Sequence, residues 1–176
     1  MKYFICLLVC LLPCFAVTID FSSGTTLPLT EDGFLIIENN FLGNTNNGAT
    51  IFTGGPSGNE LGDANIDGNF AGVEISLGGA LFEVISLDIR ATSVTGQDVQ
   101  LRTLDNSVVD GFSPTSTSFQ TVGVNTFAGL QLTGFTLNFE DTARVDNIVI
   151  RVIPEPSTYL AFLLGGLSLL YIRKRK

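Results

Sequence analysis

The central part of this chain has almost none of the side chains that usually perform acid–base or nucleophilic catalysis. Histidine and tryptophan are absent from all 176 residues, and the three cysteines lie in the first sixteen. The lysines, the tyrosines and the single methionine also fall outside residues 17–153. Because histidine, cysteine and lysine are the usual bases and activated nucleophiles, we predict a protein that is not an enzyme and has no catalytic residues.

Positive charge is equally scarce between residues 17 and 153. That segment holds four arginines against sixteen carboxylates, which gives a formal net charge of −12. Such an acidic segment is repelled by the phosphates of nucleic acids, so nucleic-acid binding is excluded. The absence of cysteine from the same segment means that it folds without disulfide bonds.

The first sixteen residues read as a secretory signal peptide. Lys2 precedes an apolar run over 3–12, and Pro13 ends this run before the small residues Cys14 and Ala16. We predict that signal peptidase cuts between Ala16 and Val17. The remaining chain of about 137 residues, 17–153, is long enough for one domain with its own core.

The C-terminal segment, residues 154–176, has three parts. Pro154, Glu155, Pro156 and Ser157 form an extended linker because proline fixes φ and lacks an N–H donor. An apolar run over 159–172 follows, predicted as a transmembrane helix shorter than the ~30 Å hydrocarbon core. Four cations then end the segment and stay cytoplasmic: Arg173, Lys174, Arg175 and Lys176.

This order of Pro-Glu-Pro motif, apolar helix and basic cluster closely resembles the PEP-CTERM sorting signal of Gram-negative bacteria. The resemblance covers about the last 23 residues. It implies that an exosortase, a membrane cysteine protease, removes the tail. It also implies export, transient insertion in the inner membrane, and release to the cell surface or the extracellular polysaccharide matrix. An ordinary tail anchor is the alternative.

Short alternating segments between residues 17 and 153 indicate strands. They cover 17–21, 33–38, 73–77, 81–89, 97–104, 106–109, 118–124, 135–139 and 145–153, and the segment 49–53 interrupts a long polar stretch. No amphipathic helix is evident, and a polar, Gly- and Asn-rich stretch covers most of 39–69. We therefore predict a single all-β sandwich or jelly roll. Residues 79–89 and 144–150 resemble strands of bacterial jelly-roll modules, including carbohydrate-binding ones.

Two groups of acidic residues are candidate calcium sites. Asp63, Asn65 and Asp67, with Gly68 and then Glu74, have the spacing of an EF-hand loop, whose oxygen ligands suit Ca²⁺. The flanks do not read as helices, so a solvated Asx-turn loop is the alternative.

The second candidate is Asp146, which would share a face with Ile148 and Ile150 if its strand is regular. Buried there, it needs hydrogen bonds, an arginine or a metal. In the jelly-roll modules that the chain resembles, an Asp at this place supports a calcium with the first strand, where Asp20 lies.

These observations leave three hypotheses for function. The first is an exported, non-enzymatic surface or matrix protein, processed by an exosortase and associated with exopolysaccharide or biofilm. The alternative is a carbohydrate- or calcium-binding jelly-roll module, although only phenylalanine remains to stack on sugar rings. The third is a glycosidase-like enzyme with a carboxylate pair, for which no recognisable motif stands in the sequence.

Overall fold

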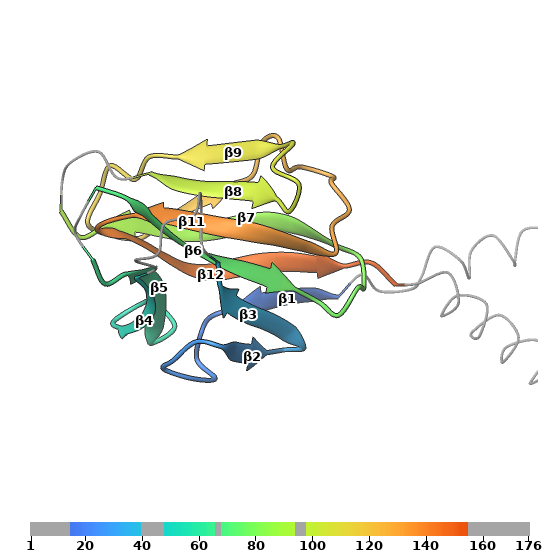
Figure 1. Cartoon of the computed structure of the whole chain (residues 1–176), viewed down its shortest axis with the longest axis horizontal. Coiled ribbons are helices and arrows are strands. Elements are labelled where there is room, and N and C mark those ends of the chain that lie inside the picture. Colours follow the sequence, from blue (N-terminus) through green and yellow to red (C-terminus); the bar gives the residue numbers. More distant parts are fainter. Residues whose placement is uncertain (1–14, 40–47, 66–67, 94–97, 155–176) are drawn as a thin grey trace, which may run out of the picture.

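The computed structural model describes residues 15–39, 48–65, 68–93 and 98–154. The described residues form strands, turns and loops, and Figure 1 shows the arrangement of the strands. The strands, in chain order, are β1 Ala16–Ile19, β2 Leu29–Glu31, β3 Phe34–Glu38, β4 Ala49–Thr53, β5 Asn59–Asp63, β6 Phe70–Ser76, β7 Phe82–Ala91, β8 Val99–Thr103, β9 Val109–Phe112, β10 Gln120–Gly123, β11 Gly134–Glu140 and β12 Ala143–Val152.

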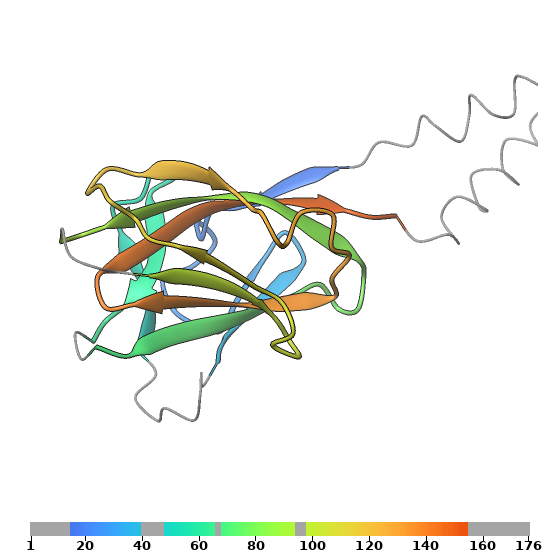
Figure 2. The same cartoon turned by 90° about the horizontal axis from the view of Figure 1, so that it is seen from above.

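The strands make two antiparallel sheets. Sheet A has the order β10-β7-β12-β5-β4, and β1 also pairs with β12. Sheet B has the order β2-β3-β6-β11-β8-β9. Figure 2 shows β1, β7 and β12 in one layer and β6 and β11 in the other. The predicted all-β sandwich is therefore confirmed for the described residues.

The core lies between the two sheets and consists of alternate residues of each strand. Phe34, Phe82 and Phe135 are fully buried, and their rings meet edge to face with centroids 5.2 and 6.0 Å apart. Aromatic pairs in this geometry add about 0.5–1.5 kcal/mol beyond the burial of their area. A core rich in phenylalanine thus supplies cohesion in a domain that has no disulfide bonds.

The sequence analysis missed β2 and β5, and it gave 49–53 only as an interruption of a polar stretch. It also placed a strand over 106–109, although β9 begins at Val109. Asn59–Asp63 has one large apolar residue, Leu61, so its alternation was invisible within the polar stretch. The hairpin turn expected near Asp105 and Asn106 is confirmed. Asn106 has a φ of 58°, and the Asp105 carboxylate accepts bonds from Thr103 and Ser107, which lowers its pKa to about 2.

Two expectations about strand faces were wrong, and bulges are the reason. Alternation along β7 predicts that Ile85 is on the core face with Leu87, yet Ile85 is 41% exposed while Leu87 is buried. Asp146 was expected to alternate regularly with Ile148. The pairing of β12 with β7 shifts register between Asp146 and Val149 and again at Ile150, and Asn147 adopts a φ of 45°. A bulge inserts an extra residue and breaks the period of two.

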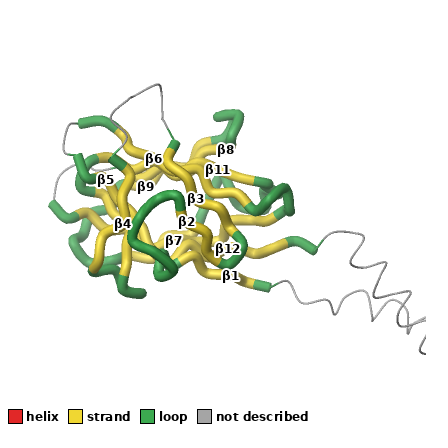
Figure 3. The backbone as a smooth tube through the Cα atoms, turned by 60° about the horizontal axis from the view of Figure 1, so that its bottom comes forward, coloured by secondary structure: helices red, strands yellow, loops and turns green. Residues whose placement is uncertain are grey.

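The two ends of the described chain lie side by side, as Figure 3 shows. The Val152 amide donates to the Phe15 carbonyl at 3.1 Å, and Ala16 pairs with Arg151. The predicted cut between Ala16 and Val17 falls at the first residue of β1. No helix within the described ranges is long and apolar enough to cross a bilayer.

Candidate functional site

The predicted sorting signal falls almost wholly outside the described residues. Pro154 follows β12 and is the last of them. Glu155, Pro156, Ser157 and the four terminal cations lie outside, as do residues 1–14 of the predicted signal peptide. These assignments remain predictions from the sequence, and the candidate sites below lie in the sandwich.

The residues with EF-hand spacing are divided between the two sheets. Asp63 ends β5 in sheet A, and its carboxylate accepts the Asn65 amide at 2.8 Å, which is an Asx turn. Glu74 lies in β6 of sheet B, opposite Thr136 and Ile37. Glu74 is four residues beyond Phe70, the first residue of β6, and therefore lies about 13 Å along this strand from its start. Strands flank the turn where an EF-hand has helices, and Asp67 lies outside the described residues.

The structure places Asp146 in a cluster of oxygen atoms. The Ser57 hydroxyl lies 2.8 Å from both carboxylate oxygens of Asp146 and 3.0 Å from the Asp20 carbonyl. One hydroxyl proton cannot serve three acceptors fully. The Ser57 and Asn147 amides also donate to Asp146, which is fully buried. Burial therefore raises the pKa of Asp146 despite these bonds.

Asp20 links this cluster to a second buried carboxylate. The Glu31 carboxylate accepts the Asp20 amide at 3.1 Å, and the two side chains share a hydrogen bond. That bond lowers the pKa of Asp20, whereas burial and the neighbouring Asp20 raise the pKa of Glu31 to about 7. The oxygen atoms of this cluster outnumber the protons available to them, and Ca²⁺ prefers oxygen ligands of this kind.

The cluster is nevertheless short of side-chain ligands. In the parts of the chain that the structure describes, no three acidic, histidine or cysteine side chains converge on one metal position. Any calcium here would be held by Asp146 and Asp20 with the Ser57 hydroxyl and the Asp20 carbonyl. The donor types fit Ca²⁺.

The outer face of sheet A carries a chain of charged and aromatic contacts. Arg90 donates two bonds to the buried Glu60 at 2.6 and 2.9 Å. Arg144 lies 3.9 Å from the same carboxylate, and its guanidinium stands 4.1 Å from the ring centroid of Phe52. Arg90 likewise stands 4.9 Å from the ring of Phe119. Every group has a partner here, so we interpret this stripe as structural.

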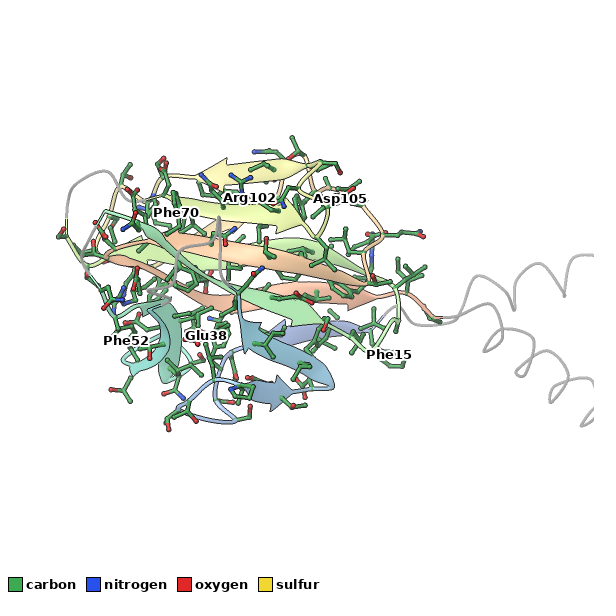
Figure 4. The ribbon with its side chains drawn as sticks, viewed as in Figure 1. Phe15, Glu38, Phe52, Phe70, Arg102 and Asp105 are labelled. Atoms are coloured by element: carbon green, nitrogen blue, oxygen red, sulfur yellow. The ribbon has the colours of Figure 1, made fainter. Side chains whose placement is uncertain are left out.

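The outer face of sheet B is polar at its centre. The pairing register aligns two rows across β6, β11 and β8. The first row is Gly72, Asn138 and Gln100, and the second is Glu74, Thr136 and Arg102. Arg102 donates two bonds to the Gln100 carbonyl oxygen at 3.1 and 2.8 Å, which fixes both side chains. Figure 4 labels Arg102 on this sheet.

Asn138 is the least satisfied group on this face. It is fully buried, and among the buried side chains of the described residues only its Oδ1 has no hydrogen-bond partner. Its amide nitrogen donates to Thr136 at a long 3.5 Å. Gly72 leaves the room for it, because a Cβ there would lie 2.3 Å from Oδ1. A buried acceptor without a donor costs about 1–3 kcal/mol, so Oδ1 of Asn138 is a candidate to accept a hydrogen bond from a water molecule or a ligand.

The sequence did not predict this face. Alternation along 135–139 predicts only that Thr136 and Asn138 face away from the core, and no pattern in the sequence singles out Gln100 or Arg102. Alternation within each strand shows which residues share a face, but the strand order decides which rows meet. The sheet order β6-β11-β8 joins residues 72, 138 and 100, and no local signal contains that order.

Comparison with known proteins assigns this chain to no family. No family model matches this sequence, and no curated protein matches it. A solved variant of a family 29 carbohydrate-binding module matches with a TM-score of 0.48 and 12% identity, over 81% of this chain and 99% of that one.

Two further solved structures show a similar degree of likeness. Another family 29 carbohydrate-binding module gives a TM-score of 0.49 and 12% identity over 84% and 98% of the two chains. The C-terminal family 6 module of a Zobellia galactanivorans laminarinase gives 0.44 and 14% over 78% and 99%. At these values the likeness assigns neither a ligand nor a residue role to this chain.

Proposed function

We propose that this protein is an exported, non-enzymatic polysaccharide-binding sandwich that an exosortase sorts to the cell surface or extracellular matrix. The observation that carries the binding part is Asn138. Its buried, unpartnered carbonyl oxygen stands in the middle of a polar row on the outer face of sheet B. A ligand with hydroxyl groups supplies the missing donor.

The neighbours of Asn138 favour a neutral polyol over a charged polymer. Gln100 and Arg102 offer an amide and a guanidinium, and Thr136 and Glu74 offer oxygen acceptors within the adjoining row. Sugar hydroxyls both donate and accept, so one ring can satisfy groups of both kinds. Residues 17–153 carry a net charge of −12, which opposes polyanions. Because Asn138 is fully buried, binding requires the surrounding side chains to move aside.

A glycan array with matched arginine variants tests the binding face. Arg102→Gln removes the charge beside Gln100 on sheet B. Arg151→Gln removes the same charge from the outer face of sheet A, where Arg151 pairs with Glu83. We expect loss of glycan retention only for Arg102→Gln, by about tenfold for a charged hydrogen bond worth ~1.5 kcal/mol. Equal binding by both variants, or no retained glycan for the parent, would reject the proposal.

The sorting part rests on the C-terminal residues and needs its own experiment. Pro154 to Ser157, the apolar run and the cations at 173–176 support processing by an exosortase. Fractionation of strains with and without that enzyme separates the outcomes. We expect a shortened extracellular form in the first strain and a full-length membrane form in the second. Full-length protein in the same fraction of both strains would contradict sorting, whatever the glycan array shows.

A further inference from the structure

The exposed apolar side chains of the sandwich gather at one end. The described residues have six large apolar side chains that are exposed, at positions 15, 35, 81, 85, 104 and 109. Leu35 pairs with Ser76, the last residue of β6, and Leu81 directly precedes β7. Leu104 follows β8 and packs against Gly134, which also pairs with Ser76. Val109 pairs with Arg102 and continues the polar row on sheet B. We therefore call Phe15, Leu35, Leu81 and Leu104 the terminal patch.

Both chain exits lie at this same end. Phe15 precedes β1, and its carbonyl accepts the Val152 amide near the end of β12. The Ile153 amide donates to the Leu81 carbonyl at 2.9 Å, so the outgoing chain leaves through the patch itself. Figure 4 labels Phe15 and Asp105 at this end, away from Phe52 and Phe70.

The distance from the patch to the apolar run is short. Residues 154–158 separate Ile153 from Tyr159, the first residue of the run. Five residues of extended, proline-containing chain span about 16 Å. When the run at 159–172 is inside a bilayer, the terminal patch therefore lies within about 16 Å of the lipid surface.

Carboxylates lie at both ends of the sandwich. Glu38, Asp63, Glu140 and Asp141 lie at the far ends of β3, β5 and β11, whereas the exposed Asp32 and Asp105 lie in turns at the terminal end. A neutral lipid surface, unlike an anionic one, does not repel these acidic turns.

We propose that the terminal patch rests on the lipid bilayer while the C-terminal segment is inserted. The sandwich is then held upright, with the outer faces of both sheets accessible from the side. This inference rests on the proposed membrane insertion of residues 159–172. It makes the patch a docking surface for neutral lipid, used before the tail is removed.

Hydrogen exchange of the full chain in phosphatidylcholine nanodiscs tests the docking. The double variant Leu81→Asp/Leu104→Asp places charge in the patch, and Ile85→Asp is the matched control. Ile85 is 41% exposed, close to Leu81 at 38%, but it lies on the outer face of sheet A. The turns at 32–33 and 105–107 report on the patch, and residues 113–118 report on the opposite end of the sheet.

In nanodiscs we expect the two reporter turns to exchange about tenfold more slowly in the parent and in Ile85→Asp than in the double variant. Residues 113–118 should exchange equally in all three, which also shows that each variant is folded. Equal exchange at the turns, in chains that co-elute with nanodiscs, would overturn the docking alone. Chains that do not co-elute with nanodiscs would overturn the insertion as well. Slowing that grows with protein concentration would identify a second copy as the occupant and also overturn the proposal.

Discussion

At the scale of single residues, we expect Asn138 to lower the stability of the fold while it contributes to ligand binding. Replacing it with leucine, which has a similar shape, removes the unpartnered Oδ1. We expect Asn138→Leu to raise the free energy of unfolding by about 1 kcal/mol, because the cost of a buried, unsatisfied acceptor disappears. The same change should abolish retention on the glycan array, because the acceptor that the ligand satisfies is gone.

Urea unfolding and the array together decide this prediction. A stabilised variant that still binds glycan would show that Asn138 does not contact the ligand. A destabilised variant that loses binding would show only that the face is packed around the amide. Gly72 keeps its place in both proteins, so the space for either side chain is the same.

Gly62 supports the other outer face by its lack of a side chain. A Cβ at this position would lie 2.4–2.7 Å from three atoms of Arg144. We expect Gly62→Ala to displace Arg144 from Phe52 and from Glu60, which costs about 2 kcal/mol of stability. Gly111→Ala on β9 is the matched control, because no atom lies within 4 Å of its Cβ position. Thermal unfolding of both variants measures the difference, and equal melting temperatures would contradict the prediction.

Neither residue was identified from the sequence. Asn138 alternates with Phe139 like any outward-facing polar residue, and Gly62 lies in a stretch that read as a loop. Their roles come from partners distant in sequence, Gly72 for one and Arg144 for the other. Spacing along the chain does not encode such pairs when a sheet order places them together.

At the scale of elements, the sequence predicted strands where apolar residues alternate and failed where they do not. The strand expected over 135–139 is observed as Gly134–Glu140, and its alternating Phe135, Leu137 and Phe139 are fully buried. The short strand β2 has only Leu29 as a large apolar residue. Its other buried residue is Glu31, and a buried carboxylate is invisible to any pattern of hydrophobicity.

Strand β2 should make the stability of the sandwich depend on pH. The pKa of Glu31 is raised from 4.5 to about 7 in the folded state. Between these two values the folded chain holds a proton that the unfolded chain has lost. The free energy of unfolding therefore falls as the pH rises from about 4.5 to about 7, and the loss persists at higher pH.

Glu31→Gln isolates this contribution, because its amide imitates the protonated acid beside Asp20. In buffer with a calcium chelator, we expect the variant and the parent to melt alike near pH 4.5. At pH 8 the variant should melt at the higher temperature, since it carries no buried charge. Scanning calorimetry across this range checks the result, and parallel curves for the two proteins would contradict it.

At the scale of the whole molecule, the sandwich separates its surfaces by role. Both sheets bury their phenylalanine and aliphatic faces against each other, and each outer face carries its own polar row. The stripe on sheet A is satisfied internally by Glu60, whereas the row on sheet B keeps an unpartnered acceptor. The first and last described residues lie together at one end of the sandwich.

The oxygen cluster at Asp146 joins three distant parts of the chain. Asp20 follows the first strand, Ser57 lies in the turn between β4 and β5, and Asp146 is near the start of β12. A cation bound there would tie these parts together and would relieve the repulsion between Asp20 and Asp146. Binding to the folded state alone stabilises it by about 2.7 kcal/mol at 100 times the dissociation constant.

We therefore expect millimolar Ca²⁺ to raise the melting temperature by several degrees over a chelator control. In a domain of this size, each kcal/mol of added stability raises the melting temperature by about 4 °C. Asp146→Asn should abolish the shift, because an amide is a poorer ligand for Ca²⁺ than a carboxylate. Asp63→Asn is the matched control and should keep the shift, since Asp63 lies in the separate Asx turn. A shift lost only in Asp63→Asn would place the ion in the turn at 63–65. No shift in the parent would show that the hydrogen bonds of Ser57 and Asn147 satisfy Asp146 without a metal.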